Sequence, residues 1–131
     1  MALTISAAAA QAMGAALATD IGAGASIEIR SGSKPATPET AASGTLLVTV
    51  PISGSFTSTG GVLTSADPAS ASPSAGGTAG YFRLKTSGGT AKLDGTVTAT
   101  GGGGDMQLGS TTITVGVPVD LGVPSITVPV A

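Results

Sequence analysis

The sequence contains no cysteine, no histidine and no tryptophan. Without cysteine there is no disulfide framework. Without histidine and cysteine, the chain lacks the commonest zinc ligands and every Ser–His or Cys–His nucleophile pair. Its seven carboxylates lie far apart in sequence and form no paired motif, although a fold could still bring two of them together. We therefore expect no catalytic residue, no cofactor and no metal site, and we do not expect an enzyme.

Charge is scarce as well. Charged residues make up 9% of the chain, and the net charge is −2 at pH 7. Nucleic-acid binding needs a basic stripe that displaces counterions. Five basic residues against seven acidic ones cannot supply such a stripe, so no nucleic-acid partner is expected.

A long hydrophobic run is also missing. Residues 1–20 are apolar, but the run depends on alanine and is interrupted by Gln11 and Gly14, so it is too weak to span a membrane. No lysine or arginine precedes it, which argues against a signal peptide. We expect no membrane partner.

Small residues are abundant instead. The chain has 21 Gly, 22 Ala and 34 Ser plus Thr, against 28 Val, Ile, Leu and Phe. Low charge with abundant Thr and Val favours a sheet-forming protein over a disordered one. Alanine and glycine add little buried area, and small domains with thin cores often gain stability from neighbouring subunits. We therefore expect a homo-oligomer.

Residues 5–19 are predicted to form a helix, because alanine is the best helix former. Thr4 or Ser6 can cap its start, and Gly22 with Gly24 can end it. The helix would present one narrow apolar stripe, made of Leu3, Ala10 and Leu17, with Met13 between the last two. Either this stripe docks against a neighbouring molecule, or the helix covers its own sheet.

Beyond residue 25 the apolar residues recur with a period of two, which is typical of strands. The ranges 26–30, 45–50 and 61–65 are predicted strands. The segments 31–44 and 66–80 are rich in Pro, Ser and Gly, so we expect surface loops there.

Residues 79–99 are predicted to form a β-hairpin around a tight turn at 87–89. Phe82 and Leu84 would face the core, and Phe82 would anchor it more than Phe56 does. The opposite face would carry a polar ridge made of Tyr81, Arg83 and Lys85. This ridge is either a solvated strand face, as antiparallel sheets usually have, or a contact surface, since aromatic and Arg residues are enriched at interfaces.

The last third of the chain begins with GGGGD at 101–105, which we expect to be a flexible junction. A calcium repeat would need Asp at the position of Met106, so calcium is not expected there. Every odd position from 113 to 123 is apolar, which predicts two strands. After Pro124 the apolar residues shift to even positions, so we expect a bulge or turn before a Pro-edged final strand. The apolar face of that strand consists of Ile126, Val128 and Val130.

Together these patterns predict a mainly β protein, a small antiparallel β-sandwich of about seven to nine strands with one N-terminal α-helix. The sandwich would be jelly-roll-like or Greek-key. Residues 1–24 would form the Ala-rich helix and its linker, and residues 25–131 would form the sandwich domain.

Five short motifs follow one another along the chain. They are Gly32 to Thr37 (GSKPAT), Gly44 to Leu47 (GTLL), Tyr81 to Arg83 (YFR), Asp105 to Leu108 (DMQL) and Ser110 to Ile113 (STTI). In this order the chain resembles a family of small structural proteins of tailed bacteriophages and prophages. The Ala-rich helix departs from that family, in which more leucine and some charge would be expected. The resemblance implies a role in virion structure and no catalysis.

Three functions stay open. The first is a capsid decoration (cement) protein that binds the major capsid lattice, or another virion protein, as a homo-oligomer, expected to be a trimer, in a virion made in the bacterial cytoplasm. The second is a tail or tail-tip protein. The third, of a different class, is an exported glycan-binding surface module, for which Tyr81 is the only candidate stacking residue. The expected interface residues are Leu3, Ala10, Leu17, Tyr81, Arg83, Lys85, Ile126, Val128 and Val130.

Overall fold

The computed structural model describes residues 4–66, 68–123 and 125–127. Within them, one helix precedes nine strands. The elements are α1 (Ala7–Ile21), β1 (Ser26–Ser31), β2 (Leu46–Pro51), β3 (Thr57–Thr59), β4 (Val62–Thr64), β5 (Gly77–Lys85), β6 (Ala91–Ala99), β7 (Met106–Leu108), β8 (Thr112–Ile113) and β9 (Ser125–Thr127).

Helix α1 begins at a serine N-cap and ends at a glycine. The Ser6 Oγ accepts a hydrogen bond from the Ala9 N–H at 3.1 Å, so Ser6 is the cap that the sequence offered beside Thr4. Gly22 ends the helix with a φ of +72°, and its N–H donates to the Ala18 carbonyl at 3.0 Å. The helix is therefore displaced by two residues from the predicted range 5–19.

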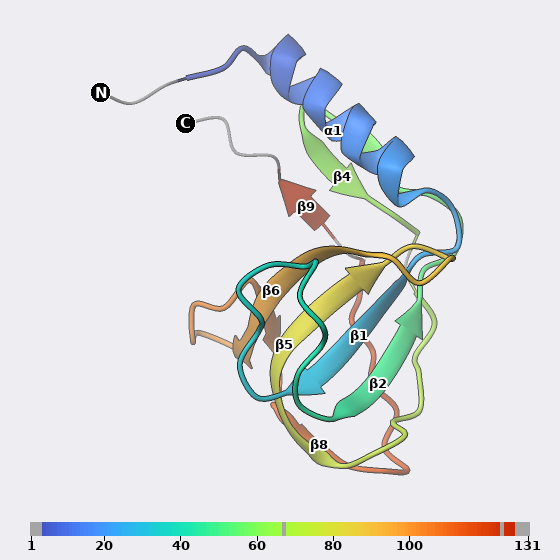
Figure 1. Ribbon diagram of the computed structural model, residues 1–131, viewed down its shortest axis with the longest axis vertical. Coiled ribbons are helices and arrows are strands. Elements are labelled where there is room, and N and C mark those ends of the chain that lie inside the picture. Colours follow the sequence, from blue (N-terminus) through green and yellow to red (C-terminus); the bar gives the residue numbers. More distant parts are fainter. Residues whose placement is uncertain (1–3, 67, 124, 128–131) are drawn as a thin grey trace.

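Two sheets build the rest of the molecule. Strands β2, β1, β5, β6 and β7 lie side by side in the larger sheet, and β8 pairs with the first residues of β5. The smaller sheet has the order β3-β4-β9, and α1 lies along β3 and β4 (Figure 1). All pairs are antiparallel except β6 with β7. The prediction of a small, mainly β sandwich with one N-terminal helix is confirmed.

The core is thin and consists of alternating residues from neighbouring strands. Ile27 and Ile29 of β1 lie opposite Val50 and Val48 of β2, and all four are buried. The smaller sheet contributes the fully buried Leu63 to the same cluster. Most contributors are medium-sized aliphatic side chains, so each buries only a modest apolar area.

The expectation that Phe82 anchors the core more than Phe56 is wrong. Phe56 is 5% exposed, whereas Phe82 is half-buried. Phe82 does lie on the core face, as predicted, because its register partners are Ile29 and Gly95. Gly95 has no side chain to cover the ring, and a Cβ there would collide with the ring, so Phe82 keeps one side open.

The segment 66–80 is not a simple surface loop. Pro68 and Pro73 are buried, and residues from Gly77 onward belong to β5. Ala71 and Val119 exchange two backbone hydrogen bonds, at 2.9 and 2.8 Å. This bridge holds the segment against the chain that follows β8.

The junction at 101–105 is also not flexible in the expected sense. It links the parallel strands β6 and β7, a connection that usually needs a dozen or more residues. Gly101 and Gly103 have φ values of +87° and +80°. A Cβ on Gly104 would lie 2.8 Å from the Thr98 Cγ2, and the Gly104 N–H donates to the Thr98 Oγ1 at 3.0 Å. Glycine is required because the chain doubles back against its own strand.

The predicted pair of strands over 113–123 is largely absent. β8 covers only Thr112–Ile113, and among the described residues that follow, Val119 forms an isolated bridge with Ala71. Val115, Val117 and Val123 are 60%, 58% and 57% exposed. The alternation of apolar residues there is therefore not one buried strand face: Ile113, Val119 and Leu121 lie in or against the core, and the other three valines are exposed.

Candidate functional site

The sheet face opposite the core carries a cluster of charged side chains. Glu28 of β1, Arg83 of β5 and Asp94 of β6 lie in one row across three adjacent strands. The side chains of Arg83 and Asp94 are 4% and 3% exposed, and their atoms Nε and Oδ1 are 2.7 Å apart. This hydrogen bond raises the pKa of the Arg83 guanidinium, although burial acts in the opposite direction.

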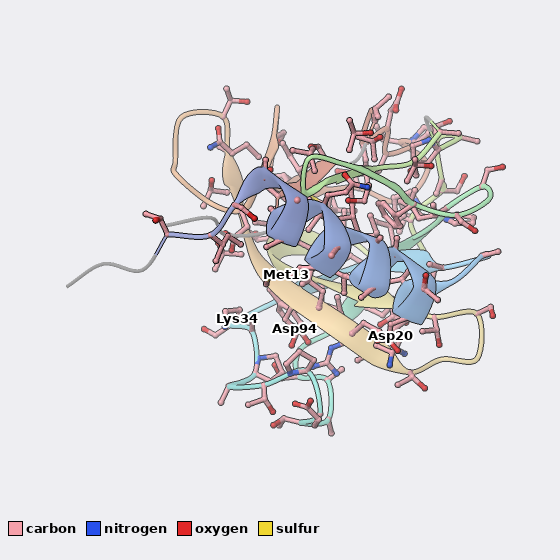
Figure 2. The ribbon with its side chains drawn as sticks, turned by 90° about the horizontal axis from the view of Figure 1, so that it is seen from above. Met13, Asp20, Lys34 and Asp94 are labelled. Carbon is pink, nitrogen blue, oxygen red and sulfur yellow. The ribbon has the colours of Figure 1, made fainter. Side chains whose placement is uncertain are left out.

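A β-bulge sets this pairing. Lys85 lies opposite Ala91, but Leu84 lies opposite Leu93, so Lys92 is the extra residue in β6. The shift brings Asp94 opposite Arg83. It also leaves Lys92 outside the ladder, where its Nζ contacts the Asp20 Oδ2 of α1 at 2.9 Å. Asp20 thus pairs with the bulge residue Lys92, and Asp94 pairs with Arg83. Figure 2 labels both carboxylates.

Glu28 joins two further cations to the row. Its Oε1 accepts from the Arg30 Nε at 3.0 Å, and its Oε2 accepts from the Lys85 Nζ at 3.2 Å. Within the described residues, every buried side-chain nitrogen and oxygen has a hydrogen-bond partner. A network that is fully satisfied in this way stabilises one packing arrangement.

The predicted polar ridge is therefore not an exposed ridge. Tyr81 is fully buried and Arg83 is 3% exposed, while only Lys85 stays partly exposed. The cause is the long segment between β1 and β2, which crosses over this face in front of β5 (Figure 1). Lys34 of that segment lies on the same side of the sheet as Asp94 (Figure 2). Sequence alternation identified the face correctly, but neither open interpretation of it allowed for this cover.

Tyr81 fastens the covering segment. Its hydroxyl donates to the Ser43 carbonyl at 2.7 Å and accepts from the Ser43 N–H at 3.0 Å. The fit is close on both sides, because a Cβ on Gly80 would overlap the Gly32 carbonyl and a Cβ on Gly44 would overlap the Ser31 carbonyl. Three of the five motifs, at 32–37, 44–47 and 81–83, thus meet at one place.

Asp105 anchors a fourth motif, residues 105–108, to β6. Its Oδ2 accepts from the Thr96 N–H at 2.9 Å and from the Thr96 Oγ1 at 3.0 Å. These bonds lower the pKa of Asp105 below its ordinary value, with a smaller contribution from Lys34. The carboxylate secures the start of β7 beside β6.

The helix stripe is used within the chain. The buried residues of α1 are Ala10, Gly14, Ala18 and Ile21. Leu17 is half-buried, Met13 is 50% exposed, and Leu3 lies outside the described residues. The helix therefore covers its own smaller sheet, and Ala10 is buried in that contact.

Sequence reasoning treated Gln11 and Gly14 only as interruptions of the alanine run. The Gln11 Nε2 donates to the Ser58 carbonyl at 2.9 Å, and its Oε1 accepts from the Gly60 N–H. Gln11 thus satisfies backbone groups along the outer edge of β3, which protects that edge from pairing with another chain. Gly14 allows this approach, since a Cβ there would overlap the Ser58 Oγ. One polar residue and one glycine inside an alanine run were the available signals.

The predicted final strand is present as β9, in which Ile126 is half-buried and packs against the core. Val128 and Val130 lie outside the described residues. β9 pairs with β4, opposite Leu63, so this part of the predicted apolar edge is covered by the chain itself.

The described residues show no cluster of three or more Asp or Glu side chains that could hold a metal ion. Within the same residues, no helix has the length and apolar character needed to cross a membrane. Comparison with protein-family models, with curated proteins and with solved structures gives no match.

Proposed function

We propose that this protein is a non-enzymatic structural protein of a tailed-bacteriophage particle, a capsid decoration (cement) protein that binds the major capsid lattice as a homo-oligomer, with a trimer as the expected state. The proposal starts from the five motifs through which the chain resembles small phage structural proteins. It also includes the virion as the location.

One observation carries the proposal. The chain buries few large apolar side chains, yet Val115, Val117 and Val123 each expose more than half of their surface. A domain with a thin core gains most from covering such side chains by association with other subunits. A protein that is used in many contacting copies fits this requirement.

The position of the motifs supports the same function. Tyr81, Gly44 and Asp105 belong to three of them, and each acts on the chain's own backbone or on a neighbouring strand. Motifs with such contacts stabilise the fold of the chain itself. A structural component of a particle depends on a stable fold, so these motifs support the proposed function.

The glycan-binding alternative loses its candidate residue. Sugar stacking needs an exposed aromatic face, whereas Tyr81 is fully buried and its hydroxyl is engaged by Ser43. The remaining rings, Phe56 and Phe82, belong to the core or line a hollow beside it.

The proposal is tested on particles. Phage or induced prophage particles from the bacterium that carries the gene are purified on a density gradient, and the tagged chain is located by cryo-electron microscopy. Many ordered copies on the head lattice are expected. Copies on the tail would show that the protein is a tail component and not a capsid decoration protein. Absence of the chain from purified particles would refute a virion role.

A further inference from the structure

Asp94 and Gly95 of β6 form the only Asp–Gly sequence in the chain. Aspartate isomerises readily before glycine, because glycine has no side chain to hinder the attack of its own amide nitrogen on the preceding carboxyl carbon. The Gly95 nitrogen would bond to the Asp94 Cγ, and a carboxyl oxygen would leave as water with the amide proton. Water then opens the resulting succinimide ring at either carbonyl, which restores aspartate or forms isoaspartate without a change in mass.

Contacts in the fold fix both residues of this reactive pair. A Cβ at position 95 would overlap the ring of Phe82, which lies opposite it on β5, and would lie 3.2 Å from the Asp105 Cβ. Glycine is therefore required there. Asp94 is required because it is the counter-ion of the buried Arg83. The sequence cannot avoid the Asp–Gly pair at this place without a loss of packing or charge compensation, so the pair has to be protected by its surroundings.

Arg83 provides that protection, because it holds the carboxylate that would react. Its Nε and Nη2 donate to the two Asp94 oxygens at 2.7 and 2.8 Å, and both side chains are almost completely buried. Succinimide formation requires the Asp94 Cγ to turn back toward the main chain of its own strand, whereas the guanidinium holds it toward β5. Ring closure also requires one carboxyl oxygen to leave, and each oxygen is bound by Arg83. The pairing of Gly95 with Phe82 keeps the attacking nitrogen in an extended strand.

We infer that Asp94–Gly95 is a latent isomerisation site, which the bidentate contact with Arg83 keeps inactive until β5 and β6 separate. Isoaspartate routes the main chain through the side-chain methylene and places the free carboxylate on Cα. The carboxylate then misses Arg83, and the rest of β6 loses its register with β5, so a modified chain does not regain the native hairpin. The amount of isoaspartate therefore measures the time that a chain has spent unfolded. This inference is independent of the function proposed above.

The first test compares the folded full-length chain with the same chain unfolded in guanidinium chloride, at neutral pH and one temperature. Isoaspartate at position 94 is quantified by electron-transfer mass spectrometry of the tryptic peptide that starts at Leu93. Because β5 and β6 lie inside the larger sheet, their separation requires global unfolding. Isomerisation should therefore be at least about a thousandfold slower in the folded chain, in proportion to its unfolded fraction. A rate above that proportion would show that Asp94 leaves Arg83 without unfolding, which overturns the inference.

The second test separates the effect of Arg83 from that of general stability. Arg83→Lys keeps the charge but loses the bidentate geometry, whereas the matched variant Tyr81→Phe lowers stability and keeps the ion pair. The isomerisation rate of each is divided by its unfolded fraction. This quotient should rise at least about tenfold in Arg83→Lys, the effect of one lost charged hydrogen bond, and stay at the wild-type value in Tyr81→Phe. Equal quotients overturn the role of Arg83. If Arg83→Lys does not fold, the wild-type comparison above decides.

The third test examines refolding. Wild-type chain that has partly isomerised in denaturant is refolded by dilution, and size-exclusion chromatography separates native from non-native protein. Isoaspartate at position 94 should be depleted at least about tenfold in the native fraction, because a buried guanidinium without its carboxylate is strongly destabilising. Equal isoaspartate contents in the two fractions would show that the modified chain still folds, and would overturn the use of isoaspartate as a measure of time spent unfolded.

Discussion

Arg83 and Asp94 form a bidentate ion pair inside the protein. The Arg83 Nε and Nη2 donate to the Asp94 Oδ1 and Oδ2 at 2.7 and 2.8 Å, and both side chains are almost completely buried. The pair lies at the centre of the face that we expected to be a solvated or partner-binding ridge. Because the two charges compensate each other, the chain's own segment between β1 and β2 can cover this charged face.

Removing one member of this pair should be costly. Asp94→Ala leaves the buried guanidinium without its carboxylate, and we expect the free energy of unfolding to fall by about 3–5 kcal/mol. The matched control is Asp20→Ala, which breaks the exposed pair with Lys92 and should cost at most about 1 kcal/mol. Urea denaturation measures both. Equal losses in the two variants would show that the Arg83–Asp94 pair is not buried in solution.

Tyr81→Phe should loosen the segment that covers the charged face. The variant keeps the ring but leaves the Ser43 N–H and carbonyl without the hydroxyl, at a cost of about 1–3 kcal/mol. The amide of Ser43 should also exchange with deuterium faster. Ser43→Ala removes only a side-chain hydrogen bond to the Ser33 carbonyl and should have a smaller effect on both measurements. Unchanged exchange at Ser43 in Tyr81→Phe would contradict the role of the hydroxyl.

Asp105 should make stability depend on pH in the acid range. Its pKa in the folded protein lies below the ordinary value of 3.8, so the stabilisation is present above the unfolded pKa and is lost as the pH falls through the folded pKa. The difference in unfolding free energy between wild type and Asp105→Asn should therefore narrow between about pH 5 and about pH 2. An NMR titration of the Asp105 carboxyl carbon gives the pKa directly. A value at or above 3.8 would contradict the hydrogen bonds from Thr96, and Thr96→Val should raise the measured value.

Gly14→Ala should destabilise the protein, although glycine to alanine inside a helix normally stabilises it by up to about 1 kcal/mol. The added Cβ would overlap the Ser58 Oγ and approach the Leu63 Cδ1 at 3.1 Å, so α1 would have to move away from β3. The double variant Gly14→Ala with Ser58→Gly removes the obstacle and should recover part of the loss. Thermal melting of the two variants tests this. If Gly14→Ala melts above the wild type, the close approach of α1 to β3 is wrong.

Local sequence rules were sufficient for several elements. Ser6 determines the start of the helix and Gly22 its end, because an N-cap and a residue with positive φ act on their nearest neighbours in sequence. The β5–β6 hairpin follows from a glycine turn between two alternating segments. The burial of Leu84 and Val97 follows from the same alternation. The candidate interface was less predictable, because burial of Tyr81 and Arg83 depends on a segment about forty residues earlier in the chain.

The sequence by itself determined the mainly β class, the single N-terminal helix and which side chains share a strand face, because each of these depends on contacts within a few residues. Only the tertiary structure decided which of those faces are covered. The extra residue Lys92 brings Asp94 opposite Arg83, the Tyr81 hydroxyl fastens Ser43 over them, and the small side chains of α1 fit against β3. Each of these contacts joins segments far apart in the chain, and a local sequence pattern does not indicate which distant segment will pack against it. For the same reason Val115 and Val117 are exposed within an alternating run that resembles a buried strand.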